Sequence, residues 1–142
     1  MSQISLVIPV YNEEAGIEIL RQHLEPILNK LTIEYEIIFV DDGSHDNTSS
    51  LIQNWIKNNS RVSLIELSRN FGHQAAITAG LKEAKGDAVI IMDADLQDPP
   101  EILPQLIEKW QHGFHVVLAE RRSRGEFFLK RILFEFFVTT QV

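Results

Sequence analysis

Short apolar runs alternate along the chain with longer segments in which apolar residues recur every three or four positions. Five runs predict β-strands, at Ile4–Val10, Tyr35–Val40, Val62–Leu67, Ala88–Met92 and His115–Ala119. Four intervening segments predict helices, at Ala15–Leu31, Asn47–Asn58, His73–Ala84 and Pro100–Trp110. Strands that are apolar on both faces and joined by helices indicate an α/β fold. We expect a Rossmann-like, mostly parallel sheet with helices on both faces.

Composition narrows the class of protein. The 142 residues are enough for one domain with a core, and 44% of them are hydrophobic. A net charge of -7 argues against nucleic acid as a partner, because such affinity is built from clustered Lys and Arg. The chain has no cysteine, which excludes disulfides and thiolate metal sites and suits a reducing cytoplasm. No apolar run is long enough for a membrane span or a signal peptide, so we expect a cytoplasmic or peripheral protein.

Two carboxylates, Asp93 and Asp95, directly follow the apolar run Ala88–Met92. At the carboxyl end of a buried strand they would project into the crevice where open α/β sheets bind ligands. Hard oxygen donors without Cys or His nearby favour Mg²⁺ or Mn²⁺, which are usually shared with substrate phosphates. This pattern predicts a nucleoside diphosphate ligand. A strand-end turn with purely local hydrogen bonds is the alternative.

The end of the first predicted strand carries a second group of candidates. Pro9 is expected to end regular strand pairing, and Tyr11 in the following loop could stack on a base. Asn12 and Glu13 have two equally good interpretations, because they could face a ligand or merely cap the next helix.

The second and third strand ends are also polar. One of Asp41 and Asp42 could accept hydrogen bonds from a base or ribose while the other orients the loop, and a solvated turn is the alternative. Asp46 and Asn47 have side chains suited to capping the next helix. Arg69 precedes a helix N-terminus, where phosphate binding is favoured. His73, in the first turn of that helix, is expected to pack or cap rather than act as a base.

Four motifs together resemble those of family 2 glycosyltransferases. They are Pro9–Glu13, Val40–Ser44, Ser68–Gly72 and Met92–Pro100, and their order and strand-end placement match as well. Within that family the chain is most similar to the polyprenyl-phosphate sugar transferases, the group of dolichyl-phosphate mannosyltransferase and bactoprenol glucosyltransferase. The resemblance covers essentially the whole chain and implies a nucleotide-sugar-binding fold of the GT-A type.

The resemblance also implies roles for individual residues. The pocket for the nucleotide sugar would be lined by Pro9, Tyr11, Glu13, Val40, Asp42, Asp93 and Ala94, to which we add Arg69 from its place before a helix. Asp95 and Gln97 would ligate Mg²⁺ or Mn²⁺, and Asp93 would hold the ribose or a metal-bound water. Arg122 would face the diphosphate. The catalytic set is therefore Asp93, Asp95 and Arg122.

The implied reaction is an inverting transfer of a sugar from a UDP- or GDP-sugar to a polyprenyl phosphate. A metal and an arginine would neutralise the departing diphosphate as the anomeric carbon gains oxocarbenium character. A lipid monophosphate is already anionic near neutral pH, so a dedicated general base is less necessary than for a sugar hydroxyl. Neither the base nor the sugar of the donor follows from these motifs.

Residues 1–120 are expected to form the nucleotide-sugar-binding domain. Residues 121–142 begin with a basic segment that holds five of the eight phenylalanines, and we expect it to start an acceptor-binding or membrane region that this short chain lacks. An amphipathic helix in an anionic membrane interface and a helix packed on the sheet or on a second subunit are equally good interpretations. The first would place the protein peripherally on the cytoplasmic face of a membrane, and the second leaves homo-oligomers open.

Two other functions remain open from the sequence. A phosphatase of the haloacid dehalogenase type also places Asp-x-Asp after an apolar strand, with Asp93 as nucleophile, although it fits the strand order and the following residues less well. A truncated module that binds a nucleotide without transferring sugar is the second alternative. Turnover would distinguish that module from an enzyme.

Overall fold

The computed structural model describes residues 2–119 and 139–140. Its strands are β1 Gln3–Val10, β2 Glu34–Asp41, β3 Val62–Glu66, β4 Ala88–Ile91 and β5 Thr139–Thr140. Its helices are α1 Glu14–Leu28, α2 Thr48–Asn58, α3 His73–Glu83, the short 3-10 turn η1 Pro100–Ile102 and α4 Leu103–Gln111. The first four predicted strands and the four predicted helices are confirmed, with small shifts at their ends.

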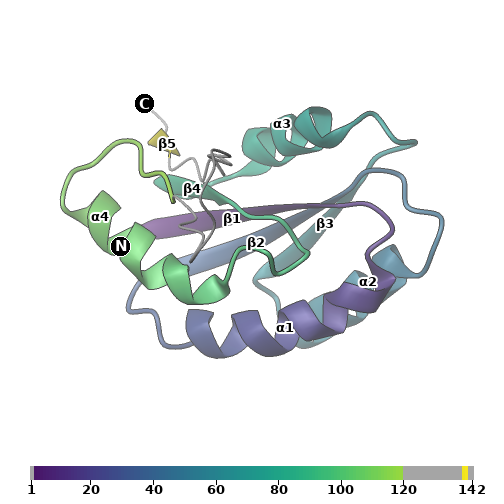
Figure 1. Cartoon of the computed structure of the whole chain (residues 1–142), viewed down its shortest axis with the longest axis horizontal. Helices are drawn as coiled ribbons and strands as arrows, with labels where there is room; N and C mark the ends of the chain where they lie inside the picture. Colours follow the sequence, from purple (N-terminus) through teal and green to yellow (C-terminus); the bar gives the residue numbers. More distant parts are fainter. Residues whose placement is uncertain (1, 120–138, 141–142) are drawn as a thin grey trace, which may run out of the picture.

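The strands form one sheet in the order β3-β2-β1-β4-β5. β1 pairs in parallel with both β2 and β4, β2 pairs in parallel with β3, and the short β5 runs antiparallel to β4. α3 covers one face of the sheet, while α1, α2 and α4 lie on the opposite side (Figure 1). The predicted mostly parallel sheet with helices on both faces is therefore confirmed.

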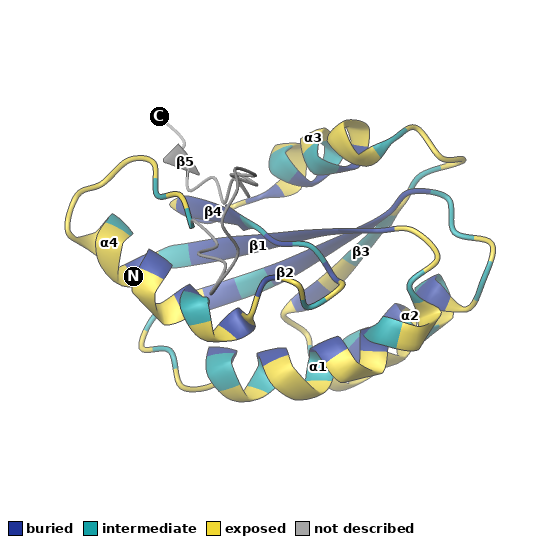
Figure 2. Ribbon diagram, viewed as in Figure 1, coloured by how far each residue is buried: buried dark blue, intermediate teal, exposed yellow. Residues whose placement is uncertain are grey.

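The core is divided by the sheet into two layers. On one side, the apolar stripe of α1, which buries Ile17, Leu20, Leu24 and Leu28, packs with α2, α4 and one face of the strands. On the other side, α3 packs on Val7 and Val40, and it approaches closely because residue 80 is glycine: a Cβ there would lie 2.4 Å from Cγ1 of Val7. Between these layers β1, β2 and β4 are mostly buried, whereas the edge strand β3 is more exposed (Figure 2).

The strand order reverses beside β1, because the chain passes from β1 to β2 and β3 on one side and returns to β4 on the other. Pairing of β1 with β4 ends at Val7, whereas pairing with β2 continues through Pro9 to Val10. The Val7 carbonyl accepts a bond from the Met92 amide, so alternation places the missing N–H of Pro9 on the β4 side. Our expectation that Pro9 ends pairing is wrong on the β2 side. The strands separate only toward β4, where such folds bind ligands.

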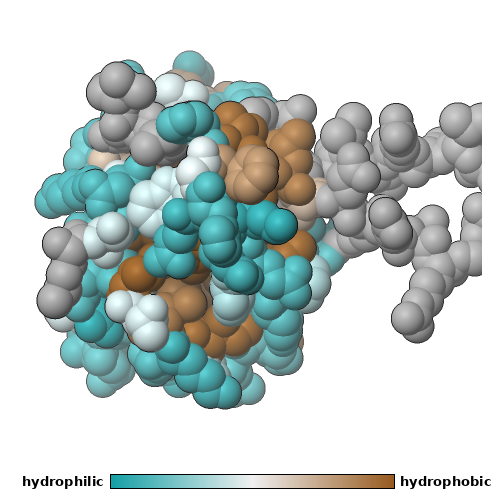
Figure 3. Space-filling model, turned by 90° about the vertical axis from the view of Figure 1, so that its left-hand side faces the viewer, coloured by the Kyte–Doolittle hydropathy of each residue, from teal (hydrophilic) through white to brown (hydrophobic). Residues whose placement is uncertain are grey.

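The predicted strand at His115–Ala119 is wrong. The alternating pattern does correspond to alternating exposure, because Val116 and Leu118 are exposed while Val117 is partly buried against the main core. A strand also needs a pairing partner, and the described edge of β4 pairs at Ala88 and Val89 with β5 instead. Apolar side chains consequently reach the surface near α4 (Figure 3), where this segment and α4 line a hollow of about 380 Å³.

The predicted boundary at residue 120, the basic phenylalanine-rich segment and Arg122 lie outside the described residues. All three stay predictions. Within the described residues, the structure contains no helix with the length and apolar character to cross a membrane.

Candidate active site at the carboxyl ends of β1, β2 and β4

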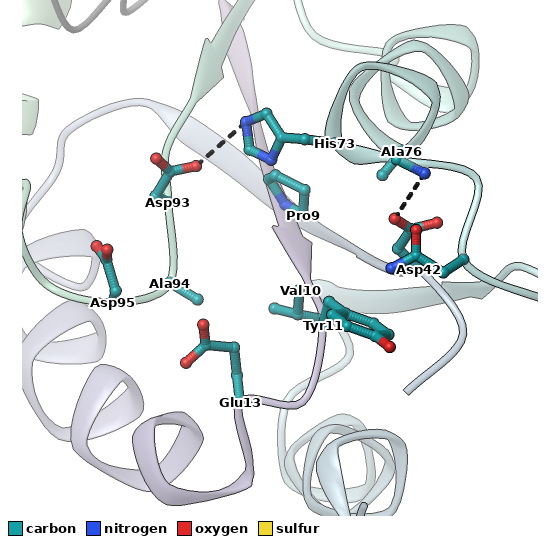
Figure 4. Close-up of a pocket in the computed structure, with 12 residues that line it drawn as sticks. Pro9, Val10, Tyr11, Glu13, Asp42, His73, Ala76, Asp93, Ala94 and Asp95 are labelled. Atoms are coloured by element: carbon teal, nitrogen blue, oxygen red, sulfur yellow. Dashed lines mark hydrogen bonds and ion pairs between the residues drawn. The ribbon is translucent and has the colours of Figure 1, made fainter. Parts of the chain in front are cut away.

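A pocket of about 350 Å³ lies where the strand order reverses. Seven of the residues expected to bind the nucleotide sugar or the metal line it: Pro9, Tyr11, Glu13, Asp42, Asp93, Ala94 and Asp95. They come from the ends of three strands that are far apart in the sequence, and the close-up shows the carboxylates of Glu13, Asp93 and Asp95 around one hollow (Figure 4). The sheet topology thus brings most of the predicted site together.

The loop after β1 is tied to the loop after β2 through Asn12. The Asn12 amide donates to Oγ of Ser44 at 2.8 Å, and its side-chain Oδ1 accepts the His45 amide at 2.9 Å. Asn12 adopts a positive φ of 52°, a conformation that costs energy in a non-glycine residue and is maintained by these contacts. Of the two interpretations of Asn12, the one in which it merely caps the next helix is therefore wrong. Its bonds fix the loop that presents Tyr11 and Glu13 to the pocket.

The N-termini of α1 and α2 share their caps. Thr48 Oγ1 accepts the Glu13 amide at 2.8 Å and donates to Oδ1 of Asp46, which also accepts the Thr48 amide at 3.0 Å. The other Asp46 oxygen accepts the Glu14 amide at 3.2 Å, so the predicted capping role is confirmed for Asp46 and extends to both helices. The predicted capping by Asn47 is wrong, because its side chain makes no cap hydrogen bond at the start of α2. Burial raises the pKa of Asp46, but hydrogen bonds from Thr48 and Glu14 outweigh it and the net pKa is lowered. Because α1 needs no cap from Glu13, that side chain is left to face the pocket.

Asp41 and Asp42 have different partners. Asp41 accepts the Ser44 amide at 2.9 Å and the Ser49 hydroxyl, so it orients its own loop as predicted for one of the pair. Asp42 accepts the Phe71 amide at 2.7 Å on Oδ1 and the Gly72 amide at 3.0 Å on Oδ2. Both carboxylates are buried, which contradicts the interpretation of a solvated turn. Asp42 therefore forms part of the pocket wall and also holds the loop before α3.

The end of β4 presents two carboxylates with different exposure. Asp93 is partly buried and lies 3.5 Å from Nε2 of His73, measured at its Oδ1, whereas Asp95 is exposed. The Gln97 amide donates to Oδ1 of Asp95 at 3.0 Å, and Leu96 between them has a positive φ of 57°. The predicted local turn is thus present, but it leaves Asp93 and Asp95 lining the pocket.

The carboxylates of the pocket repel one another. Burial raises the pKa of Glu13, and the charges of Asp95, Asp46 and Asp93 raise it further. Burial also raises the pKa of Asp93, which His73 partly offsets and Asp95 reinforces. Several unneutralised carboxylates around one hollow are typical of sites that receive a cation.

The remaining predicted residues do not line the pocket. Val40 is fully buried beneath α3, and the exposed Arg69 places its guanidinium 4.7 Å from the centre of the Phe71 ring. Gln97 is exposed beside Asp95 but outside the pocket lining, and Arg122 is not among the described residues. The roles assigned to these four residues stay predictions.

Sequence reasoning missed other residues that line the pocket: Val10, Asn70, Gly72, His73 and Ala76. Four of them belong to the loop before α3 or to its first turn. His73 is neither buried nor a cap, because its side chain is 55% exposed and α3 has no side-chain cap. The sequence did contain a signal for His73, because it begins a predicted helix at the same sheet edge as the other candidate residues.

The donor set suits a hard divalent cation that arrives with its substrate. Among the described residues, no three acidic or imidazole side chains converge into a ready-made metal centre. Mg²⁺ and Mn²⁺, however, are commonly held by one or two carboxylates, with waters and substrate phosphates completing the shell. Asp93 and Asp95 provide two oxygen-donor side chains of that kind beside the unneutralised Glu13. The residues present therefore fit such a metal.

Comparison with known proteins matches residues 5–137 to the model of glycosyl transferase family 2. The chain belongs to this family. Over 130 residues it is 47% identical to an uncharacterized glycosyltransferase, YkcC, of Bacillus subtilis, covering 91% of this chain and 40% of the relative. It is 43% identical over 129 residues to the undecaprenyl-phosphate 4-deoxy-4-formamido-L-arabinose transferase of Aeromonas hydrophila, covering 90% and 40%. A prophage bactoprenol glucosyl transferase homolog of Escherichia coli is 46% identical over 123 residues, covering 87% and 40%.

A solved structure shares the fold. The mannosyltransferase PcManGT of Pyrobaculum calidifontis, in complex with GDP-Man and Mn²⁺, matches 83% of this chain and 35% of its own with a TM-score of 0.69 and 26% identity. The predicted fold of the GT-A type is therefore confirmed. The chain spans about 40% of the length of the curated relatives it matches.

Proposed function

We propose that this chain provides the donor-binding part of an inverting, metal-dependent glycosyltransferase that uses a nucleoside diphosphate sugar and a polyprenyl phosphate acceptor. One observation carries the proposal: Tyr11, Glu13, Asp42, Asp93 and Asp95, from three strand ends, line a single pocket at the reversal of strand order. This is the place where open α/β sheets bind nucleotides.

The pocket offers complementary contacts to each part of a nucleotide sugar. Tyr11 is 41% exposed and presents a ring for stacking against the base. Asp93 can accept a hydrogen bond from a ribose hydroxyl, and Asp95 with Gln97 would hold Mg²⁺ or Mn²⁺ against the diphosphate. The PcManGT complex with GDP-Man and Mn²⁺ supports this donor class, although it leaves the choice between a UDP- and a GDP-sugar open.

The proposed reaction needs little acid–base chemistry from the protein. An oxygen of the acceptor phosphate attacks the anomeric carbon from the face opposite the leaving group, and the anomeric C–O bond breaks with its electron pair passing to the diphosphate. A bound divalent cation would supply charge neutralisation for that leaving group. The acceptor phosphate is already anionic, so no proton has to be removed from it. Arg122 is assigned the second positive charge on the diphosphate.

The lipid acceptor rests on the relatives. One is named an undecaprenyl-phosphate sugar transferase and another a homolog of bactoprenol glucosyl transferase. We extend that acceptor class to this chain and assign it a peripheral position on the cytoplasmic face of a membrane. A non-catalytic nucleotide-binding module is the second candidate, because the chain spans only about 40% of these relatives. Membership of family 2 gives no support to the phosphatase alternative.

Calorimetric titration tests the donor pocket. UDP, GDP and their glucose and mannose derivatives are titrated with and without Mn²⁺ into wild type, Asp95→Ala and Asp87→Ala. Asp87 is a matched control because it is an exposed aspartate at the opposite end of β4, where it accepts the Gln3 amide. We expect one base to bind only with Mn²⁺, at least about tenfold weaker binding in Asp95→Ala, and wild-type affinity in Asp87→Ala.

Lack of metal-dependent binding by folded wild-type protein would contradict the proposed donor site. If binding is observed, transfer from the selected donor to a polyprenyl phosphate distinguishes the enzyme from the non-catalytic module. Binding without transfer or donor hydrolysis would favour the module.

A further inference from the structure

The charges lining the pocket are unevenly distributed. Four carboxylates face it, from Glu13, Asp42, Asp93 and Asp95, and among the described lining residues only His73 can carry a positive charge. A nucleoside diphosphate would add further negative charge to the same space. The one imidazole is therefore well placed to influence how these carboxylates meet an incoming ligand.

The backbone that carries His73 is fixed from the neighbouring strand. Asp42 accepts the amides of Phe71 and Gly72, the two residues immediately before His73, at 2.7 and 3.0 Å. Gly72 has a φ of 101°, which favours glycine, and α3 begins at the next residue. The end of β2 thereby sets the position from which the His73 side chain reaches across to the end of β4.

Ordinary helix chemistry does not account for a histidine at this position. It makes no cap hydrogen bond, and a cation at a helix N-terminus is disfavoured by the helix dipole. Stability does not account for it either, because its contact with Asp93 is solvated: the two side chains are 55% and 35% exposed. The contact instead restricts the orientation of a side chain. Nε2 of His73 lies 3.5 Å from Oδ1 of Asp93 and so favours one orientation of that carboxylate.

We propose that His73 is a positioning residue that orients Asp93 for binding of the metal–nucleotide complex. The inference rests on the proposed function and deepens it, because it assigns to the donor site a residue that acts through Asp93. A series of contacts links Asp42 to the backbone of Phe71 and Gly72, and His73, the next residue, contacts Asp93. Loss of a residue that orients a metal-site carboxylate typically lowers metal affinity or activity by about 10- to 100-fold.

A double-mutant cycle at one fixed pH tests the proposal. Mn²⁺-dependent binding of UDP and GDP is measured by calorimetry for wild type, His73→Leu, Asp93→Asn and the double variant. His73→Gln keeps a side-chain N–H donor and serves as the conservative variant. His23→Leu is the matched control, because His23 is an exposed histidine on α1, outside the pocket, whose Nδ1 lies 2.8 Å from the Ile19 carbonyl oxygen of its own helix. Thermal unfolding of each variant verifies its fold.

We expect His73→Leu to weaken binding about tenfold, His73→Gln to recover most of that loss, and His23→Leu to match wild type. In the Asp93→Asn background, His73→Leu should change affinity by less than about twofold, because the residue it orients has lost its charge. Wild-type affinity in His73→Leu, or an equal loss in both backgrounds, would overturn the positioning role while leaving the proposed function intact. Absence of nucleotide binding by wild type would overturn both.

Discussion

Glu13 and Asp93 carry charges that oppose folding when no cation is bound. Burial raises the pKa of each, and neighbouring carboxylates raise it further. A carboxyl whose pKa is higher in the folded state binds its proton more tightly there. Its stabilising contribution is complete below the pKa of the unfolded chain and is lost as the pH rises through the folded pKa. Near neutral pH both ionised groups therefore lower the free energy of unfolding.

The substitution Glu13→Gln should accordingly raise the free energy of unfolding at pH 7.5 by roughly 1 kcal/mol, the scale of surface-charge optimisation for a partly solvated group. Below the ordinary pKa of glutamate, near pH 4, the difference from wild type should shrink, because Glu13 is then protonated. Urea unfolding in the presence of a chelator measures both values. Glu83→Gln, at an exposed position of α3 outside the pocket, should give no comparable pH-dependent difference. An equal effect of Glu13→Gln at both pH values would contradict the charge explanation.

At the scale of the elements, the apolar pattern determined most of what could be predicted. β1, β2 and β4 are buried along most of their length and the edge strand β3 only in part, but all four are apolar runs, so hydrophobicity alone locates them. The run at His115–Ala119 has the same pattern but no described pairing partner, and pairing depends on the rest of the fold. The periodicity of apolar residues along the chain does not indicate whether such a partner is present.

The site was predictable to the same extent as the strand ends that carry it. Asp93 and Asp95 follow a recognisable strand, and parallel topology brings them beside Tyr11 and Glu13. His73 was misjudged because its role depends on which way the first turn of α3 faces. The double engagement of Asp42 by the Phe71 and Gly72 amides depends on two loops meeting in space, which no local pattern encodes.

The cap shared by α1 and α2 leads us to predict how substitutions of Thr48 change the stability of the protein. Thr48 is fully buried, and its hydroxyl receives the Glu13 amide, which lies 35 residues away in sequence. Thr48→Val keeps the shape but leaves that amide without its partner, so the free energy of unfolding should fall by about 1–3 kcal/mol. Thr48→Ser keeps the hydroxyl and loses only a methyl group, at a cost of roughly 1 kcal/mol.

Urea unfolding monitored by circular dichroism measures both changes, provided that the slope against urea stays that of wild type. A smaller loss in Thr48→Val than in Thr48→Ser would show that methyl packing, and not the hydroxyl, holds the two helix ends together.

Across the whole molecule, the net charge of residues 1–120 is opposite in sign to that of residues 121–142. Of the 13 Lys and Arg, five lie in residues 121–142 with only two of the 20 acidic residues, so this segment carries a net charge of +3 and residues 1–120 carry -10. The same segment holds five of the eight phenylalanines. A basic, aromatic segment attached to an acidic domain favours attachment to an anionic surface with the acidic domain facing away from it.

We therefore predict that the chain co-floats with vesicles containing anionic phospholipid and not with neutral vesicles. Replacing Arg121, Arg122 and Arg124 by Gln removes three of the five positive charges and should abolish most of the binding, because each basic residue near such a surface contributes about 1 kcal/mol. A triple variant of Lys57, Lys82 and Lys85 to Gln, at exposed positions in residues 1–120, removes the same charge and should bind as wild type does. Raising the salt concentration should release the wild type, because exposed charges are screened. Binding to neutral vesicles that persists in high salt would instead show that the phenylalanines suffice, and absence of binding to anionic vesicles would favour packing of this segment against protein.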